Sequence, residues 1–126
     1  MSNTPSSLPA PWHVDAAGLE AFVETARRDG CRVLRADLGG ARDKAGVFAA
    51  IAAGLALPDY FGGNLDALYD CLTDLPPHPG GIAIALAGLP RLPQADADGL
   101  LGVFGDAIEA WAGRAGGLRV AYSTAR

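Results

Sequence analysis

Apolar residues recur with helical spacing in four separate segments of this 126-residue chain. In each segment they fall three or four positions apart, which is the spacing of one buried helix face. Asp15 precedes the first segment and Asn64 opens the third, and both residue types are good N-caps. The pattern therefore predicts four amphipathic helices. They cover residues 15–28, 43–55, 64–73 and 98–111.

Three other segments have the patterns of β-strands. Residues 31–38 alternate between more polar and more apolar positions, which indicates a strand with one polar face. Residues 82–86 are continuously apolar between glycines, and such runs are typical of strands buried on both faces in a parallel sheet. Residues 118–122 form the last short run. The sequence thus predicts three strands, separated by helices.

This order of elements is typical of an α/β fold with a small parallel sheet and right-handed helical crossovers. We expect three strands packed with helices, and an extra N-terminal helix over residues 15–28 that packs against the sheet. Residues 1–14 begin with a stretch rich in Ser, Thr and Pro, and we expect a disordered tail there. Residues 15–126 then form a single domain. Whether residues 12–14 add a fourth strand is left open.

The acidic residues are concentrated in the middle of the chain. The net charge is only −4, but between Ala45 and Gly113 the only basic residue is Arg91, against eight Asp and Glu residues. A surface of this kind does not favour direct nucleic-acid binding, which needs a basic footprint. It favours a cationic protein partner. Solubility alone is the alternative explanation of the acidic excess.

Composition also limits the compartment and the chemistry. Half of the residues are apolar, enough for a core without metal or disulfide support. Cys31 and Cys71 belong to no CxxC pattern, and neither a signal peptide nor an apolar run of about 20 residues is seen. We therefore expect a cytoplasmic protein with reduced thiols, no membrane association and no cofactor. Cys71 is expected to pack at the edge of the core.

The helix predicted over residues 64–73 has two different faces. Leu65, Leu68 and Leu72 follow the spacing of a core stripe, whereas four other side chains share a second face. Those four residues are Asp66, Tyr69, Asp70 and Thr73. They are mediocre helix formers, so helix propensity does not explain their presence on one face. We interpret this face as a surface for a partner.

The same segment resembles the barstar family of intracellular ribonuclease inhibitors. Leu57-Pro-Asp-Tyr60, Gly62 and the run from Asn64 to Thr73 carry the resemblance, which extends more thinly over residues 32–124. It implies three strands with a helical layer, and a central contact with the ribonuclease at Asp70. From the resemblance and the outer helix face together, we expect ten positions to contact the partner: Tyr60, Phe61, Asn64, Leu65, Asp66, Tyr69, Asp70, Thr73, Asp74 and Asp106.

Several of these positions depart from the family pattern. Tyr69 stands where the family has tryptophan, and Phe61 lacks the hydroxyl of the usual tyrosine. Gly63 replaces a glutamate, which removes one negative charge, and Asp106 is shorter than the matching glutamate. These differences concern the identity of the partner more than the type of function.

Three functions are weighed on this basis. The resemblance implies a monomer that forms a 1:1 complex with a basic, barnase-like, guanyl-preferring extracellular ribonuclease and occludes its active site without chemistry. The alternative is a barstar-fold immunity or adaptor module that binds another basic protein or toxin. An enzyme that uses Asp66 and Asp70 as general acid and base is a third option. It is disfavoured because no nucleophile or further catalytic group accompanies the two carboxylates.

Overall fold

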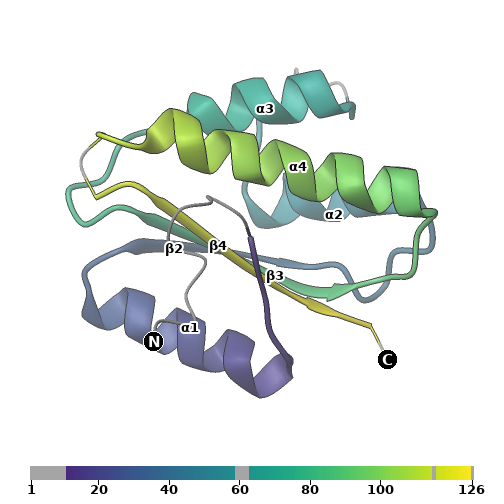
Figure 1. Cartoon of the computed structure of the whole chain (residues 1–126), viewed down its shortest axis with the longest axis horizontal. Coiled ribbons are helices and arrows are strands. Elements are labelled where there is room, and N and C mark those ends of the chain that lie inside the picture. The colour runs from purple at the N-terminus through teal and green to yellow at the C-terminus, as the bar shows by residue number, and fades with distance from the viewer. Residues whose placement is uncertain (1–10, 59–62, 115, 126) are drawn as a thin grey trace, which may run out of the picture.

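The computed structural model describes residues 11–58, 63–114 and 116–125. A parallel sheet separates two helical layers, with α1 on one face and α2, α3 and α4 on the other (Figure 1). The elements in chain order are β1 (Trp12–His13), α1 (Ala16–Arg28), β2 (Arg32–Asp37), α2 (Lys44–Gly54), α3 (Leu65–Thr73), β3 (Ile82–Leu89), α4 (Gln94–Trp111) and β4 (Leu118–Thr124). The predicted α/β class is confirmed.

The sheet has four strands in the order β1-β4-β3-β2, so the prediction of three strands is wrong. The additional strand is β1, in which Trp12 and His13 pair with Ala121 and Tyr122, and the Val14 amide donates to the Tyr122 carbonyl at 2.9 Å. A strand of two residues is too short to show any alternation. The tail expected over residues 1–14 therefore does not include β1, and residues 1–10 lie outside the described residues.

The first three helices begin where their capping residues predict. The side chains of Asp15, Asp43 and Asn64 each accept a hydrogen bond from an amide three residues further on, at 2.7–2.8 Å. Such caps satisfy amides that would otherwise lack a partner at the helix start. The fourth helix, α4, begins at Gln94 rather than residue 98. Its first turn was missed because it follows Pro93 without a side-chain cap.

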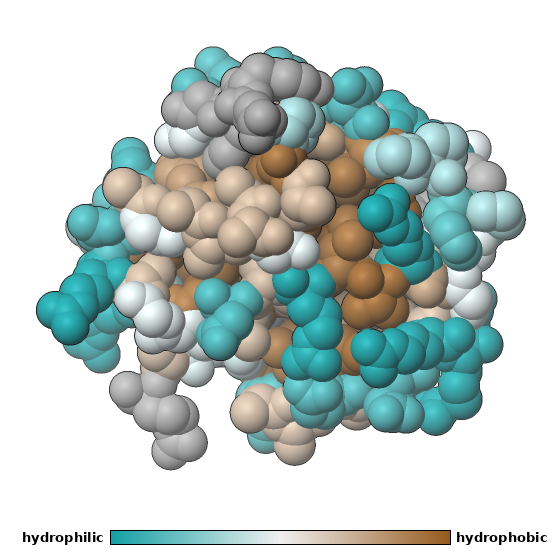
Figure 2. All heavy atoms as spheres, turned by 180° about the vertical axis from the view of Figure 1, so that it is seen from behind, coloured by the Kyte–Doolittle hydropathy of each residue, from teal (hydrophilic) through white to brown (hydrophobic). Residues whose placement is uncertain are grey.

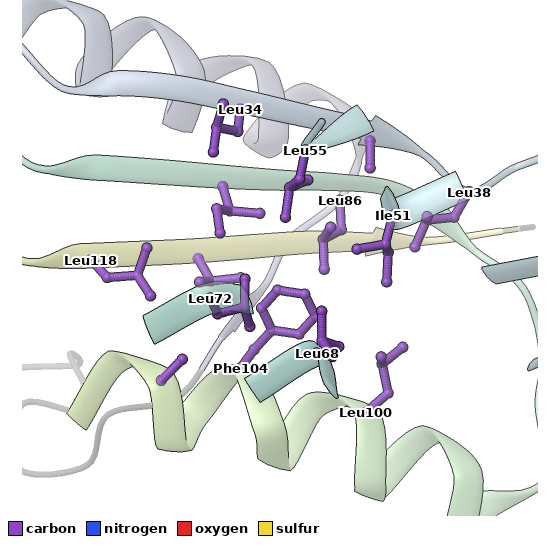
Figure 3. Close-up of a cluster of buried hydrophobic side chains, with 14 of the residues drawn as sticks. Leu34, Leu38, Ile51, Leu55, Leu68, Leu72, Leu86, Leu100, Phe104 and Leu118 are labelled. Carbon is purple, nitrogen blue, oxygen red and sulfur yellow. The ribbon is translucent and has the colours of Figure 1, made fainter. Parts of the chain in front are cut away.

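The main core lies between the sheet and α2, α3 and α4. One face of β3 points Ile82, Ile84 and Leu86 toward these helices, and all three are at most 1% exposed. Phe104 of α4 fills the centre, with Leu68 and Leu72 of α3 packed beside it (Figure 3). The prediction that β3 is buried on both faces is confirmed, although β3 extends past Leu86 to Leu89.

The opposite face of the sheet is lined with alanines. Ala83 and Ala85 of β3 and Ala121 of β4 are at most 1% exposed beneath α1, which contributes Leu19 and Val23. Ion pairs at the rim join α1 and its C-cap to the strands, with Arg35 bonded to Glu20 at 2.6 Å and Arg119 to Asp29 at 2.8 Å. As expected, the N-terminal helix is therefore docked on the sheet.

The rear of the molecule, where α2 lies, carries an apolar area bordered by hydrophilic side chains (Figure 2). The exposed positions of α2 include Ala45, Ala49 and Ala53. These small residues leave the outer face of α2 with little charge. Within the described ranges, no helix is both long and apolar enough to cross a lipid bilayer.

Candidate functional site

A groove of about 790 Å³ runs along the surface between α3 and α4. We call it the acidic groove, because four of its eight lining residues are carboxylates. The lining consists of Leu65, Asp66, Tyr69 and Asp70 from α3 and Val103, Asp106, Glu109 and Ala110 from α4. Five of the sequence-predicted binding residues thus come together: Leu65, Asp66, Tyr69, Asp70 and Asp106.

The α3 wall owes its orientation to the two faces of a short helix. Leu68, Cys71 and Leu72 are buried at 5% exposure or less, so the opposite side of the helix turns outward. Asp66 and Asp70 are exposed on that side, and Tyr69 between them is half-buried. Leu65 packs partly on the core and also lines the groove. The prediction that Leu68 and Leu72 face the core, with the carboxylates of α3 on the opposite face, is confirmed.

The α4 wall is oriented in the same way. Phe104, Ala107 and Trp111 are fully buried, which turns Asp106 and Glu109 outward. Glu109 was not among the sequence-predicted site residues. Its spacing of three positions from Asp106 places both carboxylates on one helix face, and this signal could have identified it.

Two side chains from the end of α4 hold the groove walls together. The Trp111 indole Nε1–H donates to the Leu72 carbonyl at 2.9 Å, and the Arg114 Nη1–H donates to the Thr73 carbonyl at 2.7 Å. The Arg114 guanidinium also lies 4.6 Å from the centre of the Trp111 ring. Because both acceptors are carbonyls of the last turn of α3, these bonds satisfy a helix end and fix the distance between the walls.

The four carboxylates of the groove have no hydrogen-bond or ion-pair partner in the part of the chain that the structure describes. Most of the other carboxylates do. Glu20, Asp29 and Asp96 form the ion pairs of the described residues, Asp15 and Asp43 cap helices, and Asp37 and Asp98 accept hydrogen bonds. No basic residue lines the groove. Its negative charge is therefore uncompensated from within the described chain.

The remaining predicted residues lie elsewhere. Tyr60 and Phe61 are outside the described residues. Asn64 caps α3, and its side-chain oxygen accepts from the Ala67 amide. The Thr73 hydroxyl donates to backbone carbonyls of its own helix at 3.0 and 3.1 Å. Asp74 is the C-cap of α3 and lines a different hollow of about 120 Å³. The structure thus places neither Thr73 nor Asp74 in the groove.

Cys71 lies behind the groove and is 5% exposed, as expected of a thiol packed in the core. Burial raises the pKa of its thiol above the ordinary value of 9.0, and the charges of Asp70 and Asp74 raise it further. A thiol with a raised pKa is protonated at neutral pH and is a poor nucleophile. Cys71 therefore adds packing to the site and no reactivity.

The arrangement is suited to binding a cationic partner. Across residues 11–58, 63–114 and 116–125, no group of three or more His, Cys, Asp and Glu residues is placed to hold a metal ion. What the groove offers is four unpaired carboxylates around Leu65, Val103 and Ala110, with the ring of Tyr69 between Asp66 and Asp70. Carboxylates of this kind attract Arg and Lys side chains of a partner, and an aromatic residue can anchor its apolar contacts.

A comparison with protein families matches residues 31–123 to the family described as barstar (barnase inhibitor). The match covers well over half of the chain and includes β2, α2, α3, β3 and α4 and nearly all of β4. The chain belongs to the barstar family, whose members are inhibitors and not enzymes. The matched region begins after α1, so β1 and α1 lie outside it. No curated protein matches the sequence.

Proposed function

We propose that this protein inhibits a barnase-like, guanyl-preferring ribonuclease by laying the acidic groove across the enzyme's active site. The observation that carries the proposal is the set of four unpaired carboxylates on the two helices of a barstar-family chain. The complex is one to one, the inhibitor remains cytoplasmic, and inhibition is by occlusion. The partner is an extracellular-type enzyme against which the producing cell needs protection.

The charges explain why a ribonuclease is the favoured class of partner. Such an enzyme binds RNA phosphates with Arg and Lys side chains, and an arginine fork accepts a carboxylate as well as a phosphate. Asp66 and Asp70, held on a rigid helix, stand in for substrate phosphates. Asp70 is one of the two carboxylates of the α3 wall and is the principal contact. Tyr69 supplies the aromatic anchor beside it.

A second candidate is an immunity or adaptor module that binds a basic protein or toxin other than a ribonuclease. The acidic groove favours this candidate equally, because it selects for positive charge and not for an enzyme class. Loss of a glutamate at Gly63 and of a hydroxyl at Phe61 also changes the surface offered to a barnase-like partner. The two candidates differ in what the captured partner does.

The test starts from the partner. The purified chain is immobilised and used to capture proteins from the culture medium of its source organism, and each captured protein is assayed for cleavage of RNA after guanine. A ribonuclease that the chain inhibits one to one supports the proposal. A captured basic protein without ribonuclease activity supports the second candidate instead.

Asp70→Ala then tests the site itself. The side chain is exposed and unpaired among the described residues, so the fold should be unchanged. Removing a carboxylate from a buried, hydrogen-bonded charge pair costs about 2 to 5 kcal/mol of binding. Glu24→Ala is the matched control, because Glu24 is an exposed, unpaired carboxylate on α1. If Asp70→Ala binds the ribonuclease as tightly as the control, Asp70 is not the principal contact.

A further inference from the structure

A second hollow lies on the other side of α4 from the acidic groove. It measures about 360 Å³ and is lined by Pro11 before β1, by Tyr122 of β4 and by five residues of α4. These five residues are Leu101, Gly102, Gly105, Asp106 and Glu109. Two of them, Asp106 and Glu109, also line the acidic groove. We call this second space the N-terminal hollow.

Asp106 and Glu109 therefore form a ridge between the two spaces. Gly102, Asp106 and Glu109 are four and three residues apart, so they follow one line along the outer face of α4. All three are exposed. The two carboxylates have no partner in the described chain, and no basic residue of the described ranges lines the hollow. The negative charge of the acidic groove thus continues over α4 into the N-terminal hollow.

The wall opposite α4 combines Pro11, which lies outside the family match, with Tyr122, which lies inside it. Pro11 precedes β1, the edge strand that pairs with β4, and both β1 and α4 lie toward the viewer in Figure 1. The His13 ring stacks on Tyr122 with centres 4.8 Å apart and planes within 5°. Since the matched family region starts at residue 31, the N-terminal segment adds Pro11 to this wall, and His13 packs against Tyr122 within it.

The size of a protein interface brings the hollow within reach of the partner. A stable interface covers about 800 Å² on each side, which corresponds to a disc roughly 30 Å across. A helix with its side chains is about 10 Å wide. A partner centred on the acidic groove must therefore extend across the whole of α4 and cover the hollow behind it.

We propose that the N-terminal hollow is a second part of the partner-binding surface, which receives a basic segment of the same ribonuclease. The inference rests on the proposed function and extends it. The acidic groove receives the active site, whereas the hollow between α4, Pro11 and Tyr122 contacts residues beside it. Because Pro11 of the N-terminal segment contributes to one wall, this segment helps to determine which ribonucleases fit.

Gly102 allows a direct test. A Cβ added at Gly102 would meet no atom of the described residues within 4 Å, so a side chain can start there without displacing them. Gly102→Arg would occupy the hollow and place a positive charge beside Asp106 and Glu109, which halves the negative charge of the lining. Gly102→Ala is the control for the effect of replacing a helical glycine on stability. Ala21→Arg, at an exposed position of α1, is the control for net charge. Each variant is titrated against the ribonuclease that the parent chain inhibits, and its melting temperature is measured.

We expect Gly102→Arg to bind at least ten times more weakly than Ala21→Arg, with no variant melting below the parent. Gly102→Arg within threefold of Ala21→Arg would overturn the inference. If Asp70→Ala still weakens binding in that case, the proposed function stands and only the hollow is excluded. A parent chain that inhibits no ribonuclease overturns both. If Gly102→Arg melts below the parent, Gly102→Glu is measured as well, because it occupies the same space with a negative charge. Tighter binding by Gly102→Glu than by Gly102→Arg then supports the inference, and equal binding overturns it.

Discussion

Replacing Trp111 with phenylalanine tests what holds the two groove walls together. Trp111 is fully buried, and its Nε1–H is the donor to the Leu72 carbonyl in the last turn of α3. Phenylalanine keeps an aromatic ring at the position but removes this donor. The buried carbonyl then loses its partner, which costs about 1 to 3 kcal/mol. The smaller ring also leaves a void, and its lost packing adds about 1 kcal/mol. We expect Trp111→Phe to lower the free energy of unfolding by about 2 to 4 kcal/mol.

The measurement is urea denaturation followed by far-UV circular dichroism, since the substitution removes one of the two tryptophans that fluorescence would report. The midpoint should fall while the slope of the free energy against urea stays constant. Arg114→Ala is the matched control. It removes the neighbouring bond to the Thr73 carbonyl and the contact with the indole ring, but Arg114 is exposed. Its loss should cost about 1 kcal/mol or less.

A Trp111→Phe protein whose free energy of unfolding lies within about 0.5 kcal/mol of the parent's would refute this reasoning, because an unpaired buried carbonyl destabilises a fold by more than that. Equal losses for Trp111→Phe and Arg114→Ala would also contradict it. In either case the spacing of α3 and α4 would depend on packing at Leu68 and Phe104 rather than on the hydrogen bond.

Three further outcomes are expected. The on-rate for a basic ribonuclease should fall as salt rises, with the off-rate changing less, and an on-rate that does not depend on salt would leave solubility as the only role of the acidic residues. Leu19→Ala should lower the free energy of unfolding by about 2 to 5 kcal/mol in thermal or urea unfolding, because Leu19 is 2% exposed and its alanine neighbours cannot fill the void. If this loss is smaller than that of an exposed α1 substitution such as Ala21→Ser, α1 is not docked on the sheet. The Cys71 thiol, whose pKa is raised by burial, should react slowly with Ellman's reagent at neutral pH. Because its proton is held more tightly in the folded state, its contribution to stability is complete below pH 9.0 and is lost as the pH rises further, and Cys71→Ala should remove that alkaline loss.

Local patterns in the sequence were enough to identify most of the elements. Asp15 and Asn64 marked helix starts because a cap depends only on amides three residues away. The uninterrupted apolar run of β3 indicated burial on both faces because no polar residue could be placed there. The same reasoning separated Leu68 and Leu72 from Asp66 and Asp70 on α3.

Features that depend on contacts between distant segments were harder to predict. β1 consists of two residues, and its partner strand lies more than 100 positions away. Glu109 looked like an ordinary solvated carboxylate until α4 was placed beside α3. Asp74 is a carboxylate close to Asp70 in the sequence and was therefore expected in the site. As the C-cap of α3, however, it lines a different hollow. Composition alone does not say which helix packs beside which.

The pairing of β1 with β4 also bears on how the protein is made. Trp12 is synthesised more than 100 residues before Ala121, which lies opposite it in the sheet. At about 5 to 20 residues per second, the ribosome needs several seconds to make the intervening chain. During that time β2 and α2 can form, whereas β1 has no strand to pair with. β1 can therefore join the sheet only after β4 has left the ribosome, which is later than β2 and α2 can form.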